Sequence, residues 1–245
     1  MNNKLAHTPN PSLVTLRDNK AKWNLPEYRR TGYRNLHKIN RYGILLRSDY
    51  VLTLNENIKN EIKEISSVKE MTSHKSFCSL IVGRDQDVFY EKYAEDFSPS
   101  QQQTIMSISK MFLNLFVGEL VEKGKLQLEK PISYYLPNIG SGYAEATVQD
   151  ILNMNIINAF TEDYTDPYST SFMHETVGGW RIPNEGVNEV LQEDFLNKIE
   201  TDVSGSVINN TDNAYYKSAN CDVIALLVEK ISDRKLRDWL LSSVE

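Results

Sequence analysis

The chain has little cysteine and little histidine. Its 245 residues include two cysteines and four histidines. Cys78 and Cys221 lie far apart in unlike contexts, which predicts reduced thiols in a cytoplasmic protein rather than a disulfide framework. No Cys-x-x-Cys occurs and the histidines show no ligand spacing, so we expect no metal site.

Long apolar runs and an excess of positive charge are also missing. No stretch reaches the roughly 20 apolar residues of a membrane span, and the first residues lack the apolar core of a secretory signal. The net charge of −6 argues against a general nucleic-acid binder, which needs a basic face. We therefore expect neither a membrane nor a nucleic-acid partner. The remaining composition, 40% hydrophobic and 24% charged, is that of a globular protein with a substantial core.

Three regions follow one another along the chain. Residues 1–45 show no clean period and predict an extended arm, in which the cluster of Arg29, Arg30 and Arg34 is a solvated segment. Residues 46–98 contain a charged amphipathic helix and then a β-hairpin, so they predict the first part of an α/β domain. Residues 99–245 predict a mainly helical domain.

The boundaries of the predicted elements come from local patterns. The hairpin strands are expected at 77–82 and 88–93, after a helix over 53–70. Gly124 is placed as the C-terminal cap of the helix that begins near Ser107. Further helices are expected at 147–154, 187–200 and 219–231, the last with Leu226 and Leu227 on its buried side. A hairpin followed only by helices is an incomplete sheet with open edges, which suggests that the sequence lacks further strands.

A serine and a lysine at the start of an apolar run are the strongest candidates for catalytic residues. Ser107 and Lys110 are one helical turn apart and share a face. A partly desolvated lysine amine can take the proton of a serine hydroxyl. About one Ser-x-x-Lys is expected by chance in a chain of this size, but only Ser107 opens an apolar segment, Met106–Val121, that predicts a buried helix. The same spacing recurs at Ser66 to Lys69 and at Ser232 to Lys235.

A tyrosine before the last apolar helix is the second candidate. Tyr216 stands at a loop-to-helix junction, where a phenol can enter a cleft and relay a proton to a leaving group. A neighbouring lysine cation would lower the pKa of that phenol. A half-buried packing tyrosine is the alternative that the residue by itself leaves open.

The order of these motifs resembles the serine β-lactamase and penicillin-binding superfamily, in its class C-like branch. The Ser-x-x-Lys helix is followed by Gly-Lys-Leu-Gln-Leu at 124–128, by Pro-Ile-Ser-Tyr-Tyr-Leu-Pro at 131–137 and by the segment 147–154. The segment from Glu162 to Trp180 and the Tyr-x-Ser-x-Asn-x-Asp run from Tyr216 are similar to the 6-aminohexanoate-dimer hydrolase group. The resemblance implies an α/β plus all-α, β-lactamase-like fold, in which helices flank an antiparallel sheet beside a helical domain.

The same resemblance implies a serine hydrolase that works without a cofactor on small linear amides or carboxylic esters. Ser107 would form the acyl-enzyme, Lys110 would be its base and Tyr216 would protonate the leaving group. The backbone N–H of Ser107 would supply half of the oxyanion hole. The substrate is a small molecule, and a homodimer is left open.

Five further residues receive roles from the resemblance. Tyr164 and Trp180 would line the substrate cleft, and Glu175 would face a substrate amine, although it is one methylene longer than the family's usual acid. Ser218 and Asn220 would hold the tyrosine loop through backbone hydrogen bonds. His174, beside Glu175, is expected at the rim of the cleft with no catalytic role.

Two departures from the family pattern support other interpretations. The family's Ser/Thr-Gly turn after Met154 is replaced by Asn-Ile-Ile-Asn at 155–158, so the turn must take another shape. The third motif, on an inner strand after the tyrosine loop, is expected beyond this sequence, which suggests a truncated form. A non-catalytic β-lactamase-like protein that binds a ligand or regulates is therefore the main alternative. A helical protein with chance motifs is a third.

Overall fold

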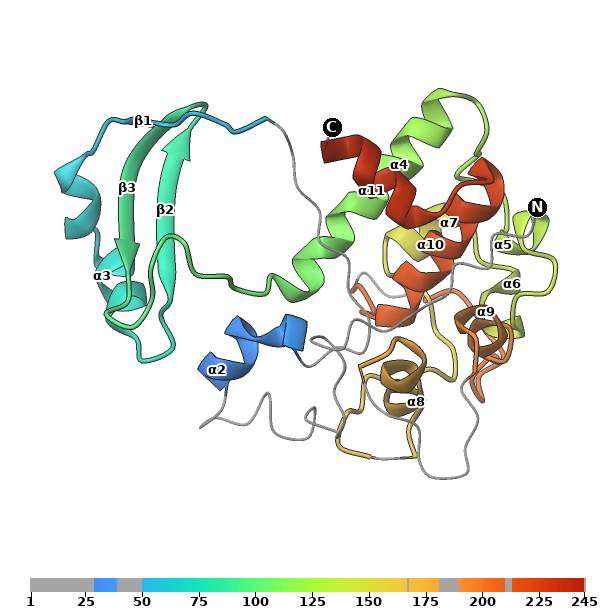
Figure 1. Cartoon of the computed structure of the whole chain (residues 1–245). Coiled ribbons are helices and arrows are strands. Elements are labelled where there is room, and N and C mark those ends of the chain that lie inside the picture. Colours follow the sequence, from blue (N-terminus) through green and yellow to red (C-terminus); the bar gives the residue numbers. More distant parts are fainter. Residues whose placement is uncertain (1–28, 39–49, 167, 181–189, 210–212, 245) are drawn as a thin grey trace. The chain divides into compact units, whose positions relative to one another are not determined.

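The computed structural model describes residues 29–38, 50–166, 168–180, 190–209 and 213–244 (Figure 1). The chain divides into two compact units. Of the described residues, 29–36 and 50–104 form the sheet unit, whereas 37–38 and those from 105 to 244 form the helical unit. Along the chain, the sheet unit gives way to the helical unit at Thr104, a few residues after the predicted boundary at residue 98.

A three-stranded sheet, in the order β1-β3-β2, forms the centre of the sheet unit (Figure 1). Strands β2 (Ser79–Arg84) and β3 (Asp87–Tyr93) are antiparallel, which confirms the predicted hairpin. The short strand β1 (Asn55–Glu56) pairs in parallel with β3 and covers the edge that we expected to be open. Gly83 is required at the bulge in β2, because a Cβ there would lie 2.6 Å from the backbone oxygen of Asp87.

The helix predicted over 53–70 is wrong in its first half. Strand β1 and the 3₁₀ helix η2 (Asn60–Glu64) occupy that part, and α3 (Ser66–Ser73) begins only after Ile65. Ile65 has extended backbone angles, φ −62° and ψ 128°, which separate the two helical turns. Charged residues at helical spacing therefore did not make one continuous helix, because η2 and α3 bury no side chain that would hold it together.

The predicted arm over 1–45 lies mostly outside the described residues. Its described part is not extended, since α2 (Arg29–Arg34) and η1 (Leu36–Lys38) are helical. Arg30 and Arg34 both pair with Asp96, and Arg30 also donates to the backbone oxygen of Phe77 at 2.6 Å. Arg30 and Arg34 are thus members of an ion-pair network rather than of a solvated segment. The two guanidinium groups lower the pKa of the Asp96 carboxyl to about 2.

Helix α10 (Ser218–Ser232) is the central element of the helical unit. It contacts α4 (Met111–Glu122), α7 (Val148–Leu152), α9 (Gln192–Leu196) and α11 (Leu236–Val244). The shorter helices α5 (Ile132–Tyr135), α6 (Ser141–Ala144) and α8 (Thr170–Val177) complete the described part of the unit. Leu227 is buried in the core as predicted, whereas Leu226 is only partly buried. The helix predicted over 187–200 is the shorter α9, and residues 187–189 lie outside the described residues.

Two predicted helix ends are confirmed in atomic detail. Gly124 has φ +66°, and its N–H donates to Val121 while the N–H of Lys125 donates to Leu120, which is the hydrogen-bond pattern of a Schellman cap. Thr147 caps α7 in a reciprocal capping box with Asp150. Both ends are determined by a few neighbouring residues, which explains why the sequence predicted them.

The helix that follows Ser107 is buried on one face only, which corrects the prediction of a fully buried helix. Leu113, Phe116, Val117 and Leu120 share the face that enters the core. The other apolar face is exposed, and its side chains are those of Ile108, Met111, Phe112 and Leu115. Each set follows the helical period, so the apolar run contains two separate stripes. Among the described residues, no helix is both long and apolar enough to span a membrane.

Candidate functional site

Ser107 lies at the start of a helical segment with a strained entry. It is the second residue of the 3₁₀ helix η3 (Met106–Lys110), which leads directly into α4. The preceding residue, Met106, has φ +45°, a left-handed conformation that is costly for a residue with a side chain. Such conformations cluster at functional sites, where the surrounding structure holds them in place. Ser107 itself is exposed.

The structure brings Ser107, Lys110 and Tyr216 together. Nζ of Lys110 donates to Oγ of Ser107 at 3.0 Å, and the phenol of Tyr216 donates to the same Oγ at 2.8 Å. Nζ of Lys110 lies 5.8 Å from the centre of the Tyr216 ring. One serine oxygen is therefore within hydrogen-bond reach of an amine and a phenol, which is the arrangement of a nucleophile with two groups able to move its proton.

The loop that carries Tyr216 is attached to the turn after α7. The backbone N–H of Tyr215 donates to the backbone oxygen of Met154 at 2.7 Å. Met154 has φ +55°, so this residue provides the left-handed conformation in a turn that lacks the family's glycine. Beyond the turn, Ile156 pairs with Ile208 in an isolated antiparallel bridge.

Lys217 is a residue of this site that the sequence did not suggest. Its side chain is buried, and Nζ donates to the backbone oxygens of Asn158, at 3.3 Å, and of Phe160. Burial lowers the pKa of the Lys217 ammonium, while the charges of Glu162 and Asp202 oppose that shift. The only signal in the sequence is its position beside Tyr216, because a lysine by itself does not indicate burial.

Tyr164 and Ser218 meet at the carboxylate of Glu162, another residue that we had not singled out. The phenol of Tyr164 donates to one oxygen of Glu162, and the backbone N–H of Ser218 donates to the other. Ser218 is the first residue of α10, so the carboxylate also lies at the positive end of that helix. Burial, followed by the bond to Glu162, raises the pKa of Tyr164. The role of Ser218 as a support of the tyrosine loop stays a prediction.

Asn220 is held differently from the expected backbone contacts. It is 0% exposed. Its Oδ1 accepts from the phenol of Tyr143 at 3.2 Å, and its Nδ2 donates to Sδ of Met154 at 3.4 Å. The side chain of Asn220 thus links α10 to α6 and to the turn after α7.

Glu175 and Trp180 lie within and just after α8. Glu175 is 8% exposed, and its backbone oxygen accepts the N–H of Trp180 at 2.8 Å. His174, next to Glu175, pairs with Asp222 of α10 and stacks on Phe195. His174 of α8 therefore contacts both α10 and α9. Contact of Glu175, Trp180 or Tyr164 with a substrate stays a prediction.

Cys221 lies near Lys110 of the site. Burial raises the pKa of the Cys221 thiol to about 11, and the nearby Lys110 cation opposes this shift. Both cysteines are free thiols. No group of three metal-ligating side chains occurs within the ranges that the structure describes.

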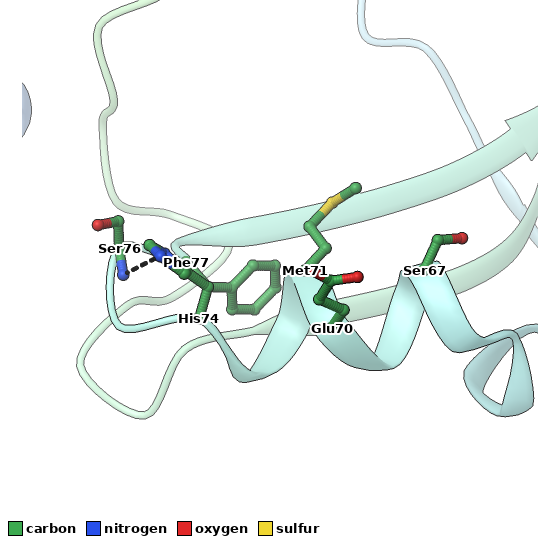
Figure 2. Close-up of a pocket in the computed structure, with 6 residues that line it drawn as sticks. All are labelled: Ser67, Glu70, Met71, His74, Ser76 and Phe77. Atoms are coloured by element: carbon green, nitrogen blue, oxygen red, sulfur yellow. Dashed lines mark hydrogen bonds between the residues drawn. The ribbon is translucent and has the colours of Figure 1, made fainter.

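A hollow of about 460 Å³ lies in the sheet unit and contains none of the predicted site residues. Figure 2 shows its lining on α3 and the turn that follows. There, Nδ1 of His74 accepts the backbone N–H of Ser76 at 3.2 Å. The lining residues are Ser67, Glu70, Met71, His74, Ser76 and Phe77. The hollow is open to solvent.

Comparison with known proteins shows the family of the chain. The family model described as Beta-lactamase matches residues 77–244, well over half of the chain. The chain belongs to this family. It is 32% identical over 155 residues to the 6-aminohexanoate-dimer hydrolase of Paenarthrobacter ureafaciens. That match covers 63% of the chain and 38% of the relative, so the chain spans well under half of the relative's length.

A solved structure shows the same fold. A protein of Bacillus anthracis assigned as a 6-aminohexanoate-dimer hydrolase matches with a TM-score of 0.71 and 15% identity. The match covers 96% of this chain and 62% of that protein. The β-lactamase-like α/β fold predicted from the sequence is thereby confirmed, and hydrolase function is supported at the level of the superfamily.

Proposed function

We propose that the protein is a serine hydrolase that forms an acyl-enzyme on Ser107 and hydrolyses small linear amides or carboxylic esters. The observation that carries the proposal is the contact of one oxygen, Oγ of Ser107, with both Nζ of Lys110 and the phenol of Tyr216. Neither partner by itself would distinguish a nucleophile from a surface serine.

Acylation uses the three side chains in sequence. The amine of Lys110 takes the hydroxyl proton while Oγ of Ser107 bonds to the carbonyl carbon. The oxyanion that forms is stabilised by the backbone N–H of Ser107, which lies in the first turn of a helical segment and has no intrahelical acceptor. When the bond to the leaving group breaks, Tyr216 protonates the amine or alcohol, and Lys110 returns a proton to Tyr216.

Hydrolysis of the acyl-enzyme reverses this proton path. Water enters where the leaving group departed. Tyr216 passes its phenol proton to Lys110 and takes a proton from the water as the water oxygen bonds to the acyl carbon. Oγ of Ser107 leaves with a proton from Lys110, so the resting state is restored. Ser107 and Tyr216 are both exposed, which leaves the reacting oxygen accessible to substrate and water.

The substrate class rests on the relatives and on the residues after α7. The name of the Paenarthrobacter relative indicates a dimer of 6-aminohexanoate as its substrate. The sequence resemblance assigns Tyr164, Glu175 and Trp180 to the substrate cleft, and Tyr164 is 42% exposed whereas Glu175 is 8% exposed. We therefore propose linear amides and short esters, with a contact from Glu175 to any substrate amine.

Covalent labelling tests the nucleophile. The protein is incubated with a fluorophosphonate probe and with p-nitrophenyl butyrate, and the adduct is located by peptide mass spectrometry. We expect one adduct on Ser107, none in Ser107→Ala, and an unchanged rate in Ser66→Ala, which removes the serine of another Ser-x-x-Lys. Adduct formation that persists in Ser107→Ala, or no adduct in the folded wild type, would overturn the proposal and favour a non-catalytic ligand-binding protein.

A further inference from the structure

Lys217 and Tyr216 point to opposite sides of the same short segment. Lys217 precedes α10 with φ −140° and ψ 122°, an extended conformation in which neighbouring side chains alternate. Tyr216 is accordingly 47% exposed and reaches Ser107, whereas Lys217 is 6% exposed. Whatever holds the side chain of Lys217 therefore also determines where the phenol of Tyr216 lies.

The ammonium of Lys217 is held by backbone rather than by a carboxylate. Its two acceptors, the backbone oxygens of Asn158 and Phe160, belong to buried residues of a segment without regular structure. That segment is itself fixed, because Nδ2 of Asn158 donates to the backbone oxygen of Gly142 at 3.2 Å, and the N–H of Ala159 donates to Glu200 at 3.0 Å. A buried cation bound to two fixed carbonyl groups has little freedom to move.

Two other contacts hold the segment on either side of Lys217. The N–H of Tyr215 is bound to the turn at Met154, and the N–H of Ser218 is bound to Glu162. In both, the donor is a backbone N–H at one end of the segment. Lys217 is the side chain that ties its middle to the interior.

We propose that Lys217 is a positioning residue for Tyr216, and that it aligns the phenol for proton transfer to the leaving group. This role rests on the proposed function of Ser107. A displacement of about 1 Å in a catalytic group can cost about 100-fold in rate. By holding Tyr216 in place, Lys217 therefore affects the chemical step without contact with the substrate.

Such a role has a signature that a merely structural role lacks. A p-nitrophenolate leaves without a proton, whereas an alkoxide must be protonated as it leaves. Misplacement of Tyr216 therefore slows the reaction of an alkyl ester more than that of its p-nitrophenyl analogue. General loss of folded protein lowers both rates by one factor.

The test compares p-nitrophenyl butyrate and ethyl butyrate, which form the same acyl-enzyme. For the full chain, kcat/KM for each ester is measured per Ser107 labelled by the fluorophosphonate, so that only competent protein is counted. In Lys217→Met we expect kcat/KM for ethyl butyrate to fall by about 100-fold and that for p-nitrophenyl butyrate to change little. Lys198→Met, which removes an exposed lysine of the same unit, should leave both values unchanged.

A double variant determines whether Lys217 acts through Tyr216. The informative quantity is the ratio of kcat/KM for ethyl butyrate to kcat/KM for p-nitrophenyl butyrate. Tyr216→Phe should lower this ratio, as Lys217→Met does. Lys217→Met added to Tyr216→Phe should not lower it further. If Lys217→Met does not fold, Lys217→Gln takes its place, because its amide still donates to one carbonyl but carries no charge to bury. We expect the same direction of change, of smaller size.

Three results would overturn this role. The first is an equal loss of kcat/KM, per labelled Ser107, for both esters in Lys217→Met. The second is an unchanged ratio of the two kcat/KM values in Lys217→Gln. The third is a further fall of that ratio when Lys217→Met is added to Tyr216→Phe. Absence of labelling in the folded wild type would instead reject the proposed function, and the role of Lys217 with it.

Discussion

The phenol of Tyr216 donates to Oγ of Ser107 over 2.8 Å, although 109 positions separate the two residues. Lys110 reaches the same oxygen from one helical turn away. The local contact follows from the spacing of the two residues, whereas the distant one depends on how α10 packs against α4. Together they distinguish Ser107 from the two other serines that begin a Ser-x-x-Lys.

Removal of the Lys110 amine should disable the nucleophile. In Lys110→Met we expect the rate of fluorophosphonate labelling of Ser107 to fall by about 10²- to 10⁴-fold, the usual contribution of a general base. The fold should persist because Lys110 is only partly buried.

The matched control for that variant is Lys125→Met, which removes an exposed lysine just beyond the cap of α4. It should label at the wild-type rate. Equal labelling rates for Lys110→Met and the wild type would show that another group activates the serine.

Two glycine-to-alanine changes should shift stability in opposite directions. A Cβ at Gly142 would lie 2.5 Å from the backbone oxygen of Glu200 and 2.8 Å from Cβ of Asn158, so Gly142→Ala should lower the free energy of unfolding by about 1–3 kcal/mol. A Cβ at Gly118, inside α4, would meet nothing within 4 Å, so Gly118→Ala should raise it by about 0.5–1 kcal/mol. Urea titration followed by circular dichroism measures both. A destabilised Gly118→Ala would contradict the open surroundings of that position.

The hydrogen bond between Tyr143 and Asn220 should contribute measurably to stability. Both side chains are 0% exposed, and burial raises the pKa of the Tyr143 phenol. In Tyr143→Phe the Oδ1 of Asn220 loses this donor, so we expect a loss of about 1–3 kcal/mol in the free energy of unfolding. Tyr134→Phe, at an exposed phenol, should change it by no more than about 0.5 kcal/mol. Equal effects of the two variants would show that the buried bond adds nothing.

The ion pairs of Asp96 should make the sheet unit sensitive to acid. The pKa of this carboxyl falls from 3.8 to about 2 in the folded protein. A lowered pKa means that the unfolded chain binds the proton more readily, so the stabilisation is complete above about pH 3.8 and is lost as the pH falls through about 2. In Asp96→Asn this part of the pH dependence should disappear.

The measurement for Asp96 is the melting temperature between pH 5 and pH 2. Asp85→Asn, in the turn between β2 and β3, is the control and should keep the wild-type dependence. A pH profile of Asp96→Asn that coincides with that of the wild type would assign the acid sensitivity to other groups.

Most features that the sequence predicted correctly depend on near neighbours. The hairpin of β2 and β3, the Gly124 cap and the start of α7 at Thr147 each involve residues only a few positions apart. Strand β1 was missed because two polar residues carry no alternating pattern, and its parallel pairing with β3 depends on a contact about 30 residues away. The helix predicted over 53–70 was wrong in its first half for a related reason. The prediction relied on the spacing of charged residues, but neither η2 nor α3 buries a side chain.

The candidate site divides in the same way. Ser107, Lys110 and Tyr216 are reactive side chains in a recognisable order, and the sequence by itself determined them, together with the family and its fold. Only the tertiary structure decided that Tyr216 meets Ser107, that Glu162 joins Tyr164 to Ser218, and that Lys217 turns inward. The physical reason is that the identity of a side chain determines which bonds it can make. The packing of α10 against segments distant in sequence determines which partners lie within reach.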